Sequence, residues 1–290
     1  MTVILSDGYL DNGIDGIAPW KSRILYDQIA RRDDATVSAS STDSDEAYVD
    51  APVSDQTWEW WRAASQPATW TVTTGSGVTV SAVGIAAHDI GSQGATVEVQ
   101  RNGVTLLSHT PSDDAPIIFL FEPVNDTSFS IRLSGGDAPP RVGVCYIGQA
   151  LSMIRPVQWS GHTPSRFNVN LTKRASTSER GQRLGTSIIR EGFSVDFNVE
   201  NLPEEWVRQE FEPFIRSAWR YGYFIAWRPM DFPEDADFTW SDEPIVPDNS
   251  GPGLPPRKGG DANGGRRMSV SWSARVYGGH VTGIPPWGAL

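Results

Sequence analysis

Residues 78–102 read VTVSAVGIAAHDIGSQGATVEVQRN, and the rest of the chain is best understood by working outward from them. The stretch opens with an apolar run and crosses a turn-rich DIGSQG at 89–94. It then continues as ATVEVQR, where Val97 and Val99 alternate with polar residues. Alternation with a period of two places one face of a strand on a core and the other in water. The stretch therefore predicts two β-strands joined by a short loop, which would form the central hairpin of a sandwich.

The segment from residue 57 to 145 has the same character throughout. Asn102-Gly103 separates two of its apolar runs, and this pair is a strong hairpin signal because both residues tolerate a positive φ. Short runs rich in Val, Ile, Thr and aromatic residues, spaced by Gly, Asn, Asp and Pro, predict a β-sandwich or jelly roll. There are eight such runs: TWEWW, ATWTVTT, VTVSAVGIA, ATVEVQ, VTLLSHT, PIIFLFE, SFSIRLS and RVGVCYIG.

A second pattern begins near residue 149. FNVNL at 167–171 and FSVDFNV at 193–199 alternate cleanly and flank a polar, basic loop at 172–185, so 167–199 is expected to form one long hairpin. Loops of that length are usually functional or disordered.

A helix is expected at 202–220, with Asn201 as its N-cap and Pro213 breaking or kinking it. Strands are expected at 221–228 and 268–277. The Pro- and Gly-rich residues 231–266 are expected to form a mobile excursion.

These patterns predict a mainly β protein: a jelly-roll-type β-sandwich and a second, split-barrel-like β domain with one short kinked helix. We expect residues 51–150 to form the sandwich and 151–290 the second domain. The N-terminal segment 1–50 is expected to join that second domain.

Composition excludes several functions. The net charge of -11 disfavours nucleic-acid binding, which needs clustered Lys and Arg. Cys145 is the only cysteine, so no intramolecular disulfide or multi-thiolate zinc site is expected, and its apolar flanks predict a buried thiol. The N-terminus shows no targeting signal, and no apolar run approaches the ~20 residues of a membrane helix. We therefore expect a soluble protein without membrane insertion.

Chemical signatures are also missing from the sequence. GxSxG, HExxH, a Walker loop and GxGxxG are absent, and the four histidines are scattered. Asp11 to Gly16 resembles half of a calcium loop, but Ser22 stands where a bidentate Glu is needed, so an ordinary turn is favoured. We predict no catalytic residue, no metal and no cofactor.

The tryptophans Trp58, Trp60 and Trp61 lie near His88 and Asp89 in the expected sandwich. They could form a stacking platform for a sugar or a partner, with the two polar residues beside it. The alternative is that the tryptophans fill the core and a backbone carbonyl satisfies His88. Trp61 has the opposite strand parity to Trp58 and Trp60, so at least one of the three is expected to face outward.

Four basic residues stand out in the long hairpin of this acidic protein: Lys173, Arg174, Arg180 and Arg183. They are either a solvated hairpin tip or an arm that docks on an acidic surface of a neighbouring subunit.

Taken together, the two halves resemble tail-tip proteins of long-tailed bacteriophages, in particular a distal tail or minor tail protein. In that family a ring-forming split barrel carries a galactose-binding-like, or discoidin-like, sandwich. TWEWW at 57–61, residues 84–100 and VCYIGQALSMIRP at 144–156 carry the resemblance to the sandwich. The long hairpin and residues 201–228 carry the resemblance to the ring domain. The excursion after Asp231 departs from the simplest family pattern.

The resemblance implies a homo-oligomeric structural protein of the virion, made in the host cytoplasm. A ring of six copies, or alternatively three, would contact tail tube and tail hub proteins. In the baseplate it would link the tube to the host-attachment proteins. A second hypothesis is a carbohydrate-binding protein that recognises a host surface glycan. A third hypothesis is a glycan-active enzyme with an ancillary sandwich. The only feature that favours it is the abundance of carboxylates.

Overall fold

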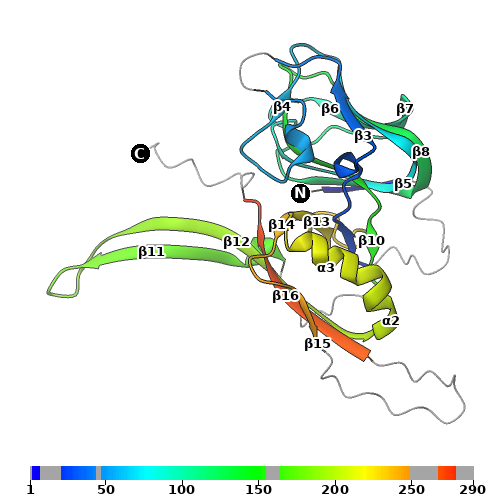
Figure 1. Cartoon of the computed structure of the whole chain (residues 1–290). Helices are drawn as coiled ribbons and strands as arrows, with labels where there is room; N and C mark the ends of the chain where they lie inside the picture. The colour runs from blue at the N-terminus through cyan, green and yellow to red at the C-terminus, as the bar shows by residue number, and fades with distance from the viewer. Residues whose placement is uncertain (1, 7–20, 44–46, 155–163, 249–266, 279–290) are drawn as a thin grey trace, which may run out of the picture.

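A computed structural model of the chain describes residues 2–6, 21–43, 47–154, 164–248 and 267–278. These residues form two β domains that pack against each other, and a two-stranded arm projects from the second domain (Figure 1). The expected mainly β class is confirmed.

The first domain is built from one hydrogen-bonded set of eight strands in the order β4-β9-β5-β8-β6-β7, with β1 on β8 and β3 on β5. Its strands are β1 (Thr2–Leu5), β3 (Ala35–Ala39), β4 (Trp61–Arg62), β5 (Ala68–His88), β6 (Thr96–Arg101), β7 (Val104–His109), β8 (Ile117–Ser134) and β9 (Arg141–Gly148).

Two long strands fold this set around a core. The first half of β5 pairs with β3 and β8, whereas its second half pairs with β9 and β8. Likewise β8 pairs with β1 at its start and with β6 at its end. The register of β5 against β8 shifts between Thr73 and Val78, and such irregularities bend a strand and increase its twist. Each long strand can therefore serve both layers of a sandwich.

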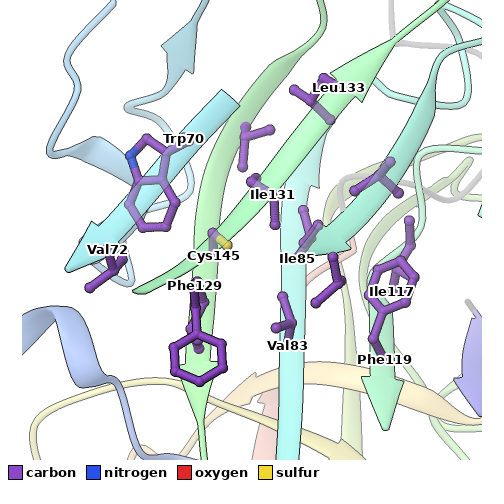
Figure 2. Packing of buried hydrophobic residues seen from close by; sticks show 14 of the residues in the cluster. Trp70, Val72, Val83, Ile85, Ile117, Phe119, Phe129, Ile131, Leu133 and Cys145 are labelled. Atoms are coloured by element: carbon purple, nitrogen blue, oxygen red, sulfur yellow. The ribbon is translucent and has the colours of Figure 1, made fainter. Parts of the chain in front are cut away.

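The inward side chains of both layers fill the sandwich core (Figure 2). Trp70, Phe119, Phe129 and Ile131 are fully buried there, together with the Cys145 thiol. Burial raises the pKa of that thiol far above its ordinary value. The prediction of an inert, buried cysteine is confirmed.

The second domain is a sheet in the order β10-β2-β13-β14-β16-β12-β11, with β15 on β16. Its strands are β2 (Arg23–Leu25), β10 (Leu151–Ser152), β11 (Val169–Thr177), β12 (Arg183–Pro203), β13 (Tyr223–Ala226), β14 (Ala236–Trp240), β15 (Val246–Asp248) and β16 (Arg267–Val276). One helical segment packs its apolar side chains on the sheet, where Phe214 meets Tyr223 edge-on at 4.9 Å between ring centroids.

That helical segment runs without a break from α2 (Glu204–Trp206) through a π-helical turn (Val207–Phe211) into α3 (Glu212–Ala218). Pro213 cannot donate the backbone hydrogen bond that an α-helix needs, and the wider turn directly before it accommodates the loss. Of the two expected effects of Pro213, a break does not occur, and the helix is instead irregular at the turn before it. Asn201 is not the N-cap either: it has a φ of 60° at an irregularity of β12, and Pro203 precedes the first helical residue.

A third apolar cluster joins the two domains. Ala82, Ala86 and Tyr146 of the sandwich pack against Phe224 and Phe238 of the second sheet. Tyr146 meets the Phe224 ring edge-on at 5.6 Å between centroids. Gln28 reinforces this junction, since its side chain donates to the Cys145 carbonyl at 2.6 Å and accepts from the Ile147 amide at 3.1 Å. The two domains therefore bury apolar surface against each other, unlike domains that are joined only by a flexible linker.

The N-terminal segment divides between the domains. β2 joins the second sheet as expected for residues 1–50, but β1 and β3 belong to the sandwich. Short strands carry no signal of which sheet edge they will complete, and this explains the error.

The residues that form the strands of the sandwich, and the pairing of these strands, also differ from expectation. ATWTVTT and VTVSAVGIA are one strand, β5, and PIIFLFE and SFSIRLS are one strand, β8. β5 and β6 do not form a hairpin, because β8 lies between them. Alternation reports which face a residue occupies, not which strand lies beside it. The Asn102-Gly103 turn between β6 and β7 is confirmed, with φ values of 47° and 77°.

The segments expected to be loops contain strands. β14 and β15 lie within the expected excursion at 231–266, of which 249–266 are outside the described residues. The expected long loop at 172–185 is mostly paired, since β11 and β12 are connected by residues 178–182 alone. The strands expected at 221–228 and 268–277 are confirmed as β13 and β16.

Candidate functional site

The loops at one end of the sandwich carry the residues singled out from the sequence, but the structure divides them between surface and core. Trp61 is fully buried, and its indole nitrogen donates to the Ser41 carbonyl at 3.1 Å. Pairing of β4 with β9 turns this side chain inward. Trp61 therefore cannot be part of the predicted stacking platform, and its inclusion there was wrong.

Trp58 faces the opposite way and is 67% exposed. Trp60, two residues later in the same loop, is half-buried, and the Arg141 guanidinium lies over its ring at 5.1 Å from the centroid. The parity argument that at least one tryptophan faces outward is confirmed by Trp58.

His88 is buried and cannot touch a ligand. Its Nε2 lies 2.9 Å from the Ala115 carbonyl, and its Nδ1 accepts from the Ile90 amide at 3.3 Å. These contacts fit the neutral ring with the proton on Nε2, and burial lowers the pKa of His88 to about 4. The satisfied core histidine was the correct alternative, and the ring has no nitrogen left to act as a base.

Asp89 orders the start of the next loop. One carboxylate oxygen accepts from the Arg141 backbone amide at 2.5 Å and the other from its guanidinium Nε at 2.9 Å. The Asp89 side chain is 16% exposed and that of Arg141 is 45% exposed. We call Trp58, Trp60, Asp89 and Arg141 together the loop-end surface.

The neighbouring loops hold this end of the sandwich in one shape. Asp114 accepts from the Ser92 amide at 2.8 Å and from its hydroxyl, which ties loop 89–95 to loop 110–116. A Cβ on Gly91 would meet the Asp113 backbone at 2.1 Å, so only glycine fits there. The loop-end surface thus rests on a preformed base, as small-ligand sites usually do.

Chemically, this surface combines an exposed indole with a charged pair whose outer atoms reach solvent. An indole offers a flat apolar face for the C–H face of a sugar ring, and Arg141 and Asp89 offer a donor and an acceptor for hydroxyl groups. Arg141 was not found from the sequence, because only the pairing of β4 with β9 brings it beside Trp60.

The basic residues of the long hairpin lie far from this surface, on the projecting arm (Figure 1). Lys173, Arg174, Arg180 and Arg183 are all exposed. Arg183 donates to the Thr186 hydroxyl at 2.7 Å; the other three make no ion pair with any part of the chain that the structure describes.

The expectation about Asp11 to Gly16 falls on residues outside the described ranges. Within those ranges no group of His, Cys, Asp and Glu could hold a metal ion. No helix in the described part of the chain is long and apolar enough to span a membrane.

No family model and no curated protein matches this chain. Solved structures match part of it. One is the Ruminococcus gnavus GH29 fucosidase in complex with fucose, at 14% identity and a TM-score of 0.38, covering 43% of this chain and 27% of that one. This chain thus spans about a quarter of the fucosidase.

Two further matches are carbohydrate-binding modules. The family 32 module of C. perfringens NanJ in complex with galactose has 14% identity and a TM-score of 0.34, covering 43% of this chain and 98% of the module. A chitosan-binding module from a Paenibacillus chitosanase/glucanase has 17% identity and a TM-score of 0.33, covering 39% and 92%. Values this low assign neither a family nor a ligand to this chain, and none of these three proteins is a tail protein.

Proposed function

We propose that this protein is a carbohydrate-binding subunit that recognises a surface glycan through the loop-end surface of its sandwich, without catalysis. The observation that carries the proposal is the exposed Trp58, two residues before Trp60, whose ring lies under the Arg141 guanidinium that also pairs with Asp89. An exposed indole presents a flat apolar face on which a sugar ring can stack. The preformed loops reduce the entropic cost of binding.

A glycan array probed with the full chain tests this proposal. We expect binding to a restricted set of glycans that Trp58→Ala abolishes. Trp219→Ala is the matched control, since Trp219 is 60% exposed on the other domain. Binding that survives Trp58→Ala, or no binding to any glycan, would remove the proposal.

The arm favours a second, compatible function: that of a subunit in a symmetric assembly. Beyond its pairing with β16, β12 continues for residues 183–192 paired with β11 alone. Leu184 is 67% exposed on this ribbon, and a Cβ added at Gly185 would have nothing within 4 Å. An isolated two-stranded ribbon is only marginally stable in water, so contact with another subunit would explain its length.

Under this second proposal the copies form a ring at the tip of a phage tail, with six copies expected and three as the alternative. The ring would contact tail tube and tail hub proteins, and the sandwich would face the host. The basic arm would meet an acidic surface of the neighbouring copy. The protein would then be found in the virion after synthesis in the host cytoplasm.

Light scattering and negative-stain images of the purified chain test the ring. We expect a closed oligomer that becomes monomeric when Lys173, Arg174, Arg180 and Arg183 are all changed to Glu. Because these side chains are exposed, the melting temperature should barely change. A wild-type chain that stays monomeric at high concentration and is absent from purified virions would contradict the ring.

A further inference from the structure

A groove of about 790 Å³ lies on the second domain, away from both the loop-end surface and the arm. It runs between the C-terminal part of the helical segment and β15. Its apolar lining includes Ile215, Trp219, Ile245, Val246, Pro247 and Met268. Ile215 and Ile245 are buried at the base of the groove, whereas Trp219 is 60% and Val246 67% exposed at its rim. An exposed Trp beside an apolar groove is typical of a protein-binding hot spot.

One wall of the groove is an open sheet edge. Within the described residues β15 pairs with β16 alone, through Val246↔Ser271 and Asp248↔Ser269. β14 pairs with the other end of β16, at Thr239↔Val276, so it does not cover β15. An uncovered edge presents backbone donors and acceptors to which an extended peptide can add as a further strand. Pro247 removes one donor, as is common on edge strands.

Three arginines and one glutamate, Glu212, line the groove, although the whole chain carries a net charge of -11. The arginines are Arg208, Arg216 and Arg220. Arg208 and Arg216 each pair with a glutamate one turn earlier, yet their side chains remain 67% and 71% exposed. Arg220 makes no ion pair among the described residues. The exposed arginines would therefore attract an acidic ligand to the groove and fix its orientation there.

We propose that this groove binds an extended segment of a partner protein in which acidic and apolar residues alternate. The segment adds as a strand beside β15 and inserts its apolar side chains between Trp219 and Met268. Its carboxylates then face Arg216 and Arg220. A period of two suits this arrangement, because alternate side chains of a strand point into the groove and toward the rim.

Synthetic peptides titrated onto the full chain, with fluorescence anisotropy as the readout, test the proposal. The probe is a labelled nine-residue peptide in which Val and Phe alternate with Glu and Asp. Its matched control carries Lys in place of every Glu and Asp. We expect saturable binding of the acidic peptide, weakening with salt, and no binding of the lysine peptide.

Substitutions in the chain test whether the acidic peptide binds in the groove. Trp219→Ala and Val246→Asp should each weaken the acidic peptide at least about tenfold, as truncation of a hot-spot residue does. The double variant Arg216→Glu/Arg220→Glu should do the same, whereas Trp58→Ala should have no effect. Circular dichroism verifies that each variant is folded; Val246→Asp changes an exposed side chain, so it tests the groove if Trp219→Ala does not fold.

Three results would overturn the proposal. The first is equal binding, or no binding, of the acidic and lysine peptides. The second is unchanged affinity in folded groove variants. The third is an oligomer of the wild-type chain that Trp219→Ala dissociates, which would show that a second copy occupies the groove. If no groove variant folds, the comparison of the two peptides on the wild-type chain decides alone.

Discussion

The ring of Phe224 lies directly against the backbone of Gly84, so close that a Cβ added to Gly84 would sit 2.7 Å from Phe224 Cδ2. Gly84 is in the middle of β5 in the sandwich, and Phe224 is in β13 of the second sheet. The absence of a side chain at one position therefore allows the two domains to approach and bury the cluster around Tyr146.

Gly84→Ala should destabilise the protein by about 1–3 kcal/mol, because overpacking forces neighbouring side chains or backbone to move. Chemical denaturation followed by fluorescence measures the change. Gly185→Ala is the control, since nothing lies within 4 Å of the added Cβ. Adding Phe224→Leu to Gly84→Ala should recover part of the loss; strictly additive effects would show that the two residues do not compete for space.

Arg31 joins the domains by a different contact, and a change to lysine should weaken it. Its guanidinium lies 4.8 Å from the Tyr146 ring centroid and 4.0 Å from that of Tyr221, and it donates to the Tyr146 hydroxyl at 2.7 Å. Lysine keeps the charge but cannot stack on one ring while donating in a fixed direction. We expect Arg31→Lys to cost about 1–2 kcal/mol in a denaturation titration. A loss seen with Arg31→Ala but not with Arg31→Lys would show that charge alone matters.

Acid should weaken the sandwich through His88. Its pKa is lowered by burial from 6.5 to about 4 in the folded protein. The unfolded chain therefore binds more protons between those values, and stability falls as the pH decreases from about 6.5 to about 4. The full shift corresponds to about 3 kcal/mol.

The His88 effect is isolated by comparison with His88→Gln, whose amide can still donate to the Ala115 carbonyl. The stability advantage of the wild type over the variant should shrink as the pH falls through this range. An advantage that stays constant from pH 7 to pH 4 would contradict the assignment of a neutral, buried His88.

Asp237 should have the opposite pH dependence. It is almost fully buried in β14, where its Oδ1 accepts from the Ser165 hydroxyl at 2.9 Å. Burial raises the pKa of Asp237 from 3.8 to about 7, with a smaller effect from Asp235. The folded state binds more protons between those values, so stability falls as the pH rises from about 4 to about 7.

Asp237→Asn keeps an acceptor for Ser165 and removes the titration. Relative to this variant, the wild type should lose up to about 4 kcal/mol between pH 4 and pH 7. Denaturation curves at several pH values measure the difference. Parallel pH profiles for the two proteins would show that Asp237 is already ionised at pH 4.

Structural features that depend on residues adjacent in the sequence could be predicted from the sequence. The Asn102-Gly103 turn, the alternation in β16 and the apolar flanks of Cys145 led to correct predictions, because each depends on a few adjacent residues. The continuous β5 and β8 could not be foreseen, since an irregular strand and a turn both interrupt an alternating pattern.

The candidate site was only partly predictable for the same reason. Strand parity predicted that Trp61 and Trp58 face opposite sides. Which of the two faces the core depends on the pairing between β4 and β9. His88 and Asp89 are adjacent in sequence yet point to different environments, one to the core and one to Arg141. Arg141 itself lies too far along the chain for any local pattern to link it to Trp60.

The most direct test of carbohydrate binding at the loop-end surface is a nitrogen–proton NMR titration of the full chain labelled at its tryptophan indoles. The Trp58 signal is assigned from its loss in Trp58→Phe and followed as lactose, or a glycan selected on the array, is added. We predict a saturable shift of the Trp58 signal while that of Trp219 stays in place. A Trp58 signal that does not move, or one that moves no more than Trp219, would contradict the proposed function.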